Sequence, residues 1–91
     1  MHSAEKNLRS CLRAQKCAFE CVIIFQDIKT GYVVDSDYGN GYRVLGVQYH
    51  LQTKETEGIE ESLRSLGFAK NQFGYTCPDG YVQVFFREDD V

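Results

Sequence analysis

The sequence predicts an α+β fold, with an antiparallel sheet of about five strands and two helices in the order αβββαββ. Two segments carry apolar residues at helical spacing, and five segments have the β-branched, aromatic or alternating composition of strands. Consecutive strands are joined by short turns rich in Gly, Asp and Asn. The length of 91 residues suits one compact domain, which we expect to span residues 1–91.

The first helix is predicted over residues 4–18, with Ser3 as its N-cap. One face of this segment is apolar, and Leu8 and Leu12 represent it. The opposite face is basic. If the helix continued to residue 21, Cys17 and Cys21 would lie one turn apart on the same face.

Three strands are then predicted as a meander. They cover residues 20–28, 32–34 and 42–51, with turns at 29–31 and 35–41. The third strand alternates, with Leu45, Val47, Tyr49 and Leu51 on an apolar face and Val44, Gly46, Gln48 and His50 on a more polar face. Tyr49 is assigned to the core.

A second helix is predicted to begin at Thr53 or Thr56 as N-cap and to end at Gly67. Phe68 anchors its exit. A terminal hairpin follows over residues 73–87, with its turn at 78–80. This hairpin completes the predicted sheet.

Charge is unevenly distributed along the chain. Residues 1–16 carry a formal charge of +3 and the remainder −6, which together give the net charge of −3. An acidic body argues against a whole-surface grip on nucleic acid, but it permits a local contact through the first segment. The longest apolar run is five residues, far short of the roughly 20 needed for a membrane span, and the first five residues do not resemble a signal peptide. We expect a soluble, cytoplasmic protein that does not bind membranes.

The four cysteines, Cys11, Cys17, Cys21 and Cys77, allow three interpretations. Reduced thiols are favoured because no export signal is recognised. A disulfide such as Cys17–Cys77 is a second interpretation. A zinc site completed by His2 or His50 is the third, although the spacing lacks the paired short repeats of a zinc knuckle.

Familiar catalytic and ion-binding patterns do not fit the sequence. The segment from Asp35 to Gly46 fails as a calcium loop, because Asn40 stands where glycine is needed and Gly46 where a bidentate glutamate is needed. No nucleophile elbow or paired-histidine metal helix is recognised, and only two histidines are present. We therefore expect a protein that is not an enzyme and uses no cofactor.

The six tyrosines are the most informative excess, since tyrosine combines a rigid apolar ring with a polar tip. We expect a small acidic module that binds, inhibits or regulates a protein partner through an exposed tyrosine and carboxylate surface. Because acidic surfaces engage basic grooves, a nucleic-acid-handling protein is one such partner. The predicted contact residues are Asp35, Asp37, Tyr38, Tyr42, Glu57, Glu60 and Glu61.

Two alternatives use other parts of the chain. The basic face of the first helix can contact phosphates, which predicts a nucleic-acid-binding domain that uses Lys6, Arg9, Arg13 and Lys16. A thiol or zinc protein is the other alternative. An open sheet also leaves free edges, such as residues 81–87 or 32–34, through which two copies can form a homodimer.

Overall fold

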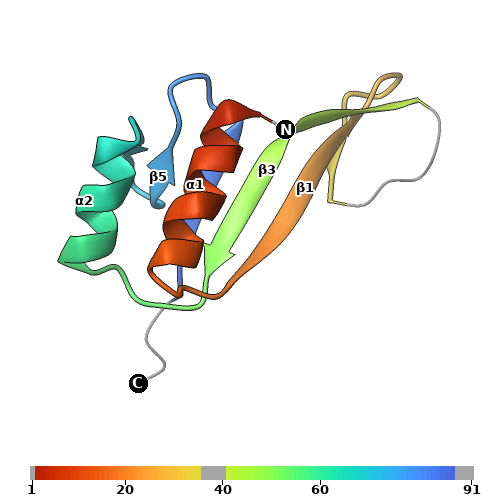
Figure 1. Ribbon diagram of the computed structural model, residues 1–91. Helices are drawn as coiled ribbons and strands as arrows, with labels where there is room; N and C mark the ends of the chain where they lie inside the picture. Colours follow the sequence, from red (N-terminus) through yellow and green to blue (C-terminus); the bar gives the residue numbers. More distant parts are fainter. Residues whose placement is uncertain (1, 36–40, 88–91) are drawn as a thin grey trace.

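The computed structural model describes residues 2–35 and 41–87, and it confirms the α+β class. Both helices lie on one face of a mixed six-stranded sheet (Figure 1). The elements are α1 (Ser3–Ala14), β1 (Phe19–Asp27), β2 (Val33–Val34), β3 (Tyr42–Leu51), α2 (Glu57–Ser65), β4 (Ala69–Lys70), β5 (Tyr75–Thr76) and β6 (Val82–Phe86). The strand order across the sheet is β2-β1-β3-β6-β5-β4.

Helix α1 is shorter than predicted and has a different cap. His2, not Ser3, is the N-cap, because its Nδ1 accepts a hydrogen bond of 3.1 Å from the Ala4 N–H. The helix ends at Ala14, since Lys16 adopts a φ of 55° and the Cys17 N–H turns back to the Leu12 carbonyl. The predicted extent to residue 18 is therefore wrong.

The chain entering β1 also separates two of the cysteines. Cys17 lies in the turn after α1, whereas Cys21 lies within β1. The two residues are thus not one helical turn apart, because the β-branched run that begins at Val22 pairs with β3 instead of extending the helix.

Helix α2 begins where the second predicted cap stands. The Thr56 hydroxyl accepts a hydrogen bond of 3.4 Å from the Ile59 N–H, and Ile59 and Leu63 face the core. Gly67 follows the helix with a φ of 93°, and Phe68 is buried as predicted. Glycine tolerates this left-handed conformation without a Cβ clash.

The predicted all-antiparallel sheet needs one correction. Strand β6 pairs in parallel with β3 and antiparallel with β5, which places it inside the sheet. The expected free edge at residues 81–87 is therefore wrong, because α2 and the β4–β5 segment carry the chain back before it runs beside β3. The two outer strands are β2 and β4, each with two residues.

The core lies between the sheet and the two helices. Leu8 and Leu12 of α1 meet Tyr49, Val82 and Val84, all of which are fully buried. The predicted inward position of Tyr49 is confirmed. Beneath α2, on the same face of the sheet, Ile59, Leu63, Phe68 and Tyr75 complete the same cluster.

Candidate functional site

The most exposed apolar part of the described chain is an extension of the sheet that no helix covers. Strands β1 and β3 run beyond α1 and, with β2, form a projection that we call the hairpin arm, residues 23–35 and 41–45 (Figure 1). Within the residues that the structure describes, seven large hydrophobic side chains are exposed, and six of them belong to this arm. They are Ile23, Ile28, Tyr32, Val33, Val44 and Leu45.

The arm exists because the strands are longer than the helix that packs on them. The 12 residues of α1 span about 18 Å. The 10 residues of β3 span about 33 Å. Roughly half of the strand length therefore extends past the helix end, and its apolar side chains lose their cover.

Four arm residues form an apolar strip that continues the core layer. Ile23 is paired with the buried Val47, so both side chains lie on the helix face of the sheet. Phe25 follows two residues later on the same face, and its cross-strand partners are Val34 and Val44. We call Ile23, Phe25, Val34 and Val44 the apolar strip.

A bulge in β3 brings this strip into register. Ile24 pairs with Gly46 but Phe25 pairs with Val44, which leaves Leu45 as the extra residue. The bulge realigns the alternation, so that Val44 lies beside Phe25. Without it, Leu45 in place of Val44 would lie beside Phe25.

Hydrogen bonds hold the arm in one conformation. The Asp27 carboxylate accepts from the N–H of Lys29 at 2.8 Å, and the Gly31 N–H donates to the Asp27 carbonyl at 2.8 Å. Farther along, the Arg43 guanidinium donates two hydrogen bonds to the Gln26 side-chain oxygen, at 2.9 and 2.7 Å. A pre-ordered arm loses less conformational entropy on binding than a flexible one.

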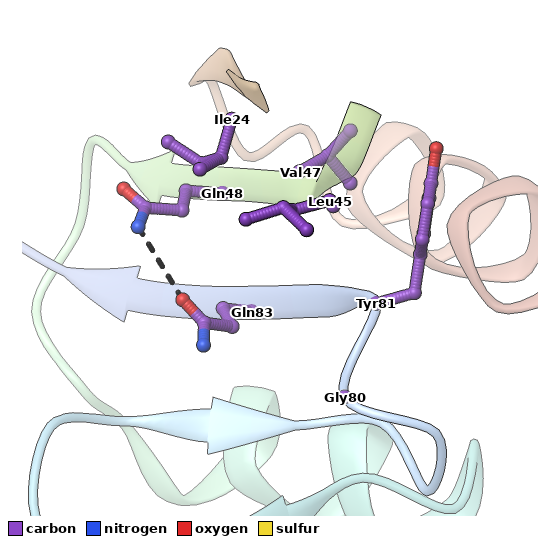
Figure 2. Close-up of a pocket in the computed structure, with 8 residues that line it drawn as sticks. Ile24, Leu45, Val47, Gln48, Gly80, Tyr81 and Gln83 are labelled. Carbon is purple, nitrogen blue, oxygen red and sulfur yellow. Dashed lines mark hydrogen bonds between the residues drawn. The ribbon is translucent and has the colours of Figure 1, made fainter. Parts of the chain in front are cut away.

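The opposite face carries a small hollow next to Gly46. Figure 2 shows Ile24 and Leu45 on one side of it, with the Gln48 and Gln83 amides hydrogen-bonded at 3.4 Å. The hollow measures about 220 Å³. A Cβ on Gly46 would lie 2.4 Å from the Tyr81 carbonyl oxygen, so glycine is needed where β6 begins beside β3.

The structure divides the predicted acidic and tyrosine residues between two places. Asp35, which is exposed, and Tyr42, which is half-buried, belong to the arm, and both have interaction partners. The predictions for Asp37 and Tyr38 lie outside the described residues. Glu57, Glu60 and Glu61 are on α2, which lies on the other side of α1 from the arm (Figure 1).

Of the helix α2 acids, Glu60 has an internal role. Its carboxylate accepts from the Tyr75 hydroxyl at 2.9 Å and from Lys70 Nζ at 3.2 Å. Lys70 also pairs with Glu55 at 3.1 Å. Hydrogen bonding with Glu55, Tyr75 and Lys70 lowers the pKa of Glu60 to about 2. Glu60 therefore ties α2 to β4 and β5, while Glu57 and Glu61 remain exposed.

The basic side of α1 is anchored to the sheet at one point. Arg9 Nε donates to the Tyr49 hydroxyl at 2.5 Å, and that hydroxyl donates to Glu5 Oε2 at 2.5 Å. Burial and the Glu5 hydrogen bond raise the pKa of Tyr49 far above its ordinary value. The Arg9 guanidinium also lies over the Phe19 ring, 5.6 Å from its centroid. Lys6 and Arg13 are exposed on the same side of the helix, and Lys16 is exposed in the turn that follows it.

A second polar cluster joins the start of α1 to the turn between β5 and β6. Asp79 accepts from the Cys77 thiol at 2.9 Å through Oδ1 and contacts His2 Nε2 at 2.6 Å through Oδ2. The His2 ring stacks on Tyr81 at a centroid distance of 4.6 Å. No local sequence pattern predicts this contact, because His2 and Asp79 are 77 positions apart.

This arrangement does not activate the thiol. Burial and the hydrogen bond to Asp79 raise the pKa of Cys77, while hydrogen bonds from Cys77, Tyr81 and His2 lower the pKa of Asp79. The carboxylate lies between the sulfur and the imidazole, so His2 is not placed to take the thiol proton. The cluster fastens the start of α1 to the β5–β6 turn.

The other cysteine interpretations gain no support from the geometry. All four cysteines are free. Among the described residues, no three or more His, Cys, Asp or Glu side chains are grouped so that they could hold a metal ion. Burial is the largest cause that raises the pKa of Cys17.

No family model, curated protein or solved structure matches this chain. The candidate site is therefore argued from the chain's own residues. None of the described helices is long and apolar enough to span a membrane. The sequence did contain one usable signal for the arm: the strand predicted at 42–51 spans about 33 Å, whereas a helix over residues 4–18 spans about 22 Å.

Proposed function

We propose that this protein is a non-enzymatic module that binds a protein partner through the hairpin arm. The apolar strip carries the proposal, because it continues the core layer past α1 and leaves Ile23 44% and Val44 46% exposed. Clustered exposed apolar side chains of this kind mark interaction surfaces. The module inhibits or regulates its partner by occupying a surface, in the cytoplasm, where free thiols persist.

The strip suits the apolar face of a helix supplied by the partner. On the neighbouring part of the sheet, α1 places Leu8 and Leu12 over the core strands. A partner helix laid beside the end of α1 would cover Ile23, Phe25 and Val44 in the same way, with anchors at helical spacing.

Charge adds a preference for a basic partner. Asp35 directly follows β2, Tyr42 begins β3, and Asp37 and Tyr38 lie between these strands in the sequence. Carboxylates at the end of an apolar surface select partners with cationic residues at the matching end. A nucleic-acid-handling protein with a basic groove has this chemistry.

The test compares capture by three forms of the protein. Wild type, I23T/V44T and F73S are immobilised and exposed to a native cell lysate, and the retained proteins are quantified by mass spectrometry. Threonine keeps the β-branched shape of both strip residues, so the strands are preserved. Phe73 is 69% exposed but lies off the arm, which makes F73S the matched control for loss of an exposed apolar group.

We expect a partner that wild type and F73S retain and that I23T/V44T loses. A D35N/D37N variant should retain the same partner more weakly and with less dependence on salt. Equal retention by wild type and I23T/V44T would refute the arm as the contact surface. Light scattering of the purified protein distinguishes a foreign partner from a homodimer built on the same strip.

A further inference from the structure

The outer side of α1 forms a second surface, distinct from the hairpin arm. A shallow hollow of about 490 Å³ lies against this helix, and its lining residues are Lys6, Arg9, Ser10 and Arg13. They are spaced three and four residues apart, so they share one side of the helix. Lys16 follows just after the helix end.

Three of these cations have no acidic partner within the described chain. Among residues 2–35 and 41–87, no ion pair includes Lys6, Arg13 or Lys16. The only acid in α1 is Glu5, which is 8% exposed and is occupied by the Tyr49 hydroxyl and by Arg9. The helix therefore presents positive charge to solvent without a neighbouring acid on the same side.

Arg9 is held in place before any ligand binds. Its Nε donates a hydrogen bond to the Tyr49 hydroxyl, and its guanidinium lies over the rings of Phe19 and Tyr49, at 5.6 and 5.4 Å from their centroids. Fixing an arginine in this way removes part of the entropy that a free side chain loses on binding. Tyr49 is itself fully buried, so this anchor belongs to the rigid core.

We infer that this side of α1 binds the phosphodiester backbone of a nucleic acid without reading its sequence. Lys6 and Arg13 are about 10 Å apart along the helix axis, which matches about three nucleotide steps of a duplex at about 3.4 Å of axial rise per step. Serine and arginine are common phosphate donors, and both line the hollow. No base-reading motif accompanies them, so affinity rests on charge.

A membrane surface is the less suitable polyanion. An interfacial helix must insert its apolar face among lipid chains. The apolar face of α1 is already committed, since Leu8 and Leu12 are fully buried against the sheet. The adjacent helix α2 exposes Glu57 and Glu61. A broad anionic bilayer would repel these carboxylates more than a narrow nucleic-acid strand would.

Fluorescence anisotropy with short labelled DNA, as duplex and as single strand, tests the inference. If four cations contact duplex phosphates, affinity falls about 150-fold between about 50 and about 200 mM salt. The K6Q/R13Q variant should bind more weakly, with a fall of only about 12-fold over the same range. The K6R/R13K variant keeps both charges and should bind as wild type does.

The matched control is K29Q/R64Q, which removes one exposed lysine and one exposed arginine from elsewhere in the molecule. It should bind as tightly as wild type. Circular dichroism verifies that every variant is folded. Absence of binding to both DNA forms at low salt overturns the inference, and so does equal weakening by K29Q/R64Q. Binding to anionic phospholipid vesicles in preference to DNA also overturns it.

Discussion

Removal of the Tyr49 hydroxyl tests how α1 is fixed to the sheet. In the variant Tyr49→Phe the ring keeps its packing, including the contact with Phe19 at 5.1 Å between centroids. The hydrogen bonds to Glu5 and from Arg9, both 2.5 Å, are lost. The variant therefore isolates one oxygen atom within a fully buried side chain.

The expected cost is dominated by Glu5. A hydrogen bond to a charged group contributes about 1.5–3 kcal/mol, and a buried acceptor left unsatisfied costs a similar amount. Arg9 stays partly exposed and can bond to water, and it remains near Glu5 at 3.7 Å, so the two losses do not add fully. We expect Tyr49→Phe to lower the free energy of unfolding by about 2 kcal/mol. For a protein of 91 residues the whole free energy of unfolding is about 5–14 kcal/mol.

Urea unfolding followed by circular dichroism measures this change. With a slope of about 1–2 kcal/mol per molar urea, the midpoint should fall by about 1–2 M. Tyr32→Phe is the control, because Tyr32 is 74% exposed, and its midpoint should match wild type. A double-mutant cycle with Glu5→Gln should show a coupling of about 1 kcal/mol or more between the two positions. Additive effects, or an unchanged midpoint for Tyr49→Phe, would refute the proposed anchor.

Three further predictions concern other contacts. Gly46→Ala forces a Cβ against the Tyr81 carbonyl and should lower the free energy of unfolding, measured with urea, by about 1–3 kcal/mol. Gly58→Ala is the control and should not destabilise the fold, because a Cβ at Gly58 has no neighbouring atom within 4 Å. Equal urea midpoints for the two variants would contradict this. Because the pKa of Glu60 is lowered to about 2 from 4.5, its stabilising contribution is present above pH 4.5 and is lost as pH falls toward 2. The melting temperature of wild type should therefore fall more than that of E60Q as the pH is lowered from 4.5 to about 2. Equal falls for the two proteins would exclude this role of Glu60. Cys77 is buried and its pKa is raised, so it should resist alkylation by iodoacetamide at neutral pH until the protein unfolds. Peptide mapping measures the alkylation of each cysteine. If Cys77 is alkylated as fast as the half-buried Cys11, its hydrogen bond to Asp79 is contradicted.

Local patterns determined most of the elements. The alternation of residues 42–51 predicted β3 with its bounds and the inward side chains of Val47, Tyr49 and Leu51, and Thr56 marked the start of α2. The predicted apolar face was wrong at its outer end, because the bulge leaves Leu45 unpaired and exposed and brings Val44 beside Phe25. These signals depend on residues within a few positions of one another, which is why they can be read without knowing the fold. The end of α1 was misjudged, because the turn at Lys16 is fixed by a positive φ that the residue type does not favour.

The sites depend on contacts between distant segments. The acids predicted to form one surface are divided between the arm and α2, and Glu60 is engaged by Lys70 and Tyr75. A single list of charged residues cannot show this division, because it follows from where each element packs. The basic residues of α1 were found from the sequence since a helix places residues three and four apart on one side.

The sequence by itself determined the element types, the inward face of β3 and the basic side of α1, because short-range periodicity controls each of them. Only the tertiary structure decided that β6 runs parallel to β3, that His2 meets Asp79, and that the apolar strip of the arm lies beyond the end of α1. Those outcomes depend on which distant surfaces meet and on how far a helix of given length reaches along a strand. Neither the pairing of distant surfaces nor the reach of a helix along a strand is encoded within any one segment.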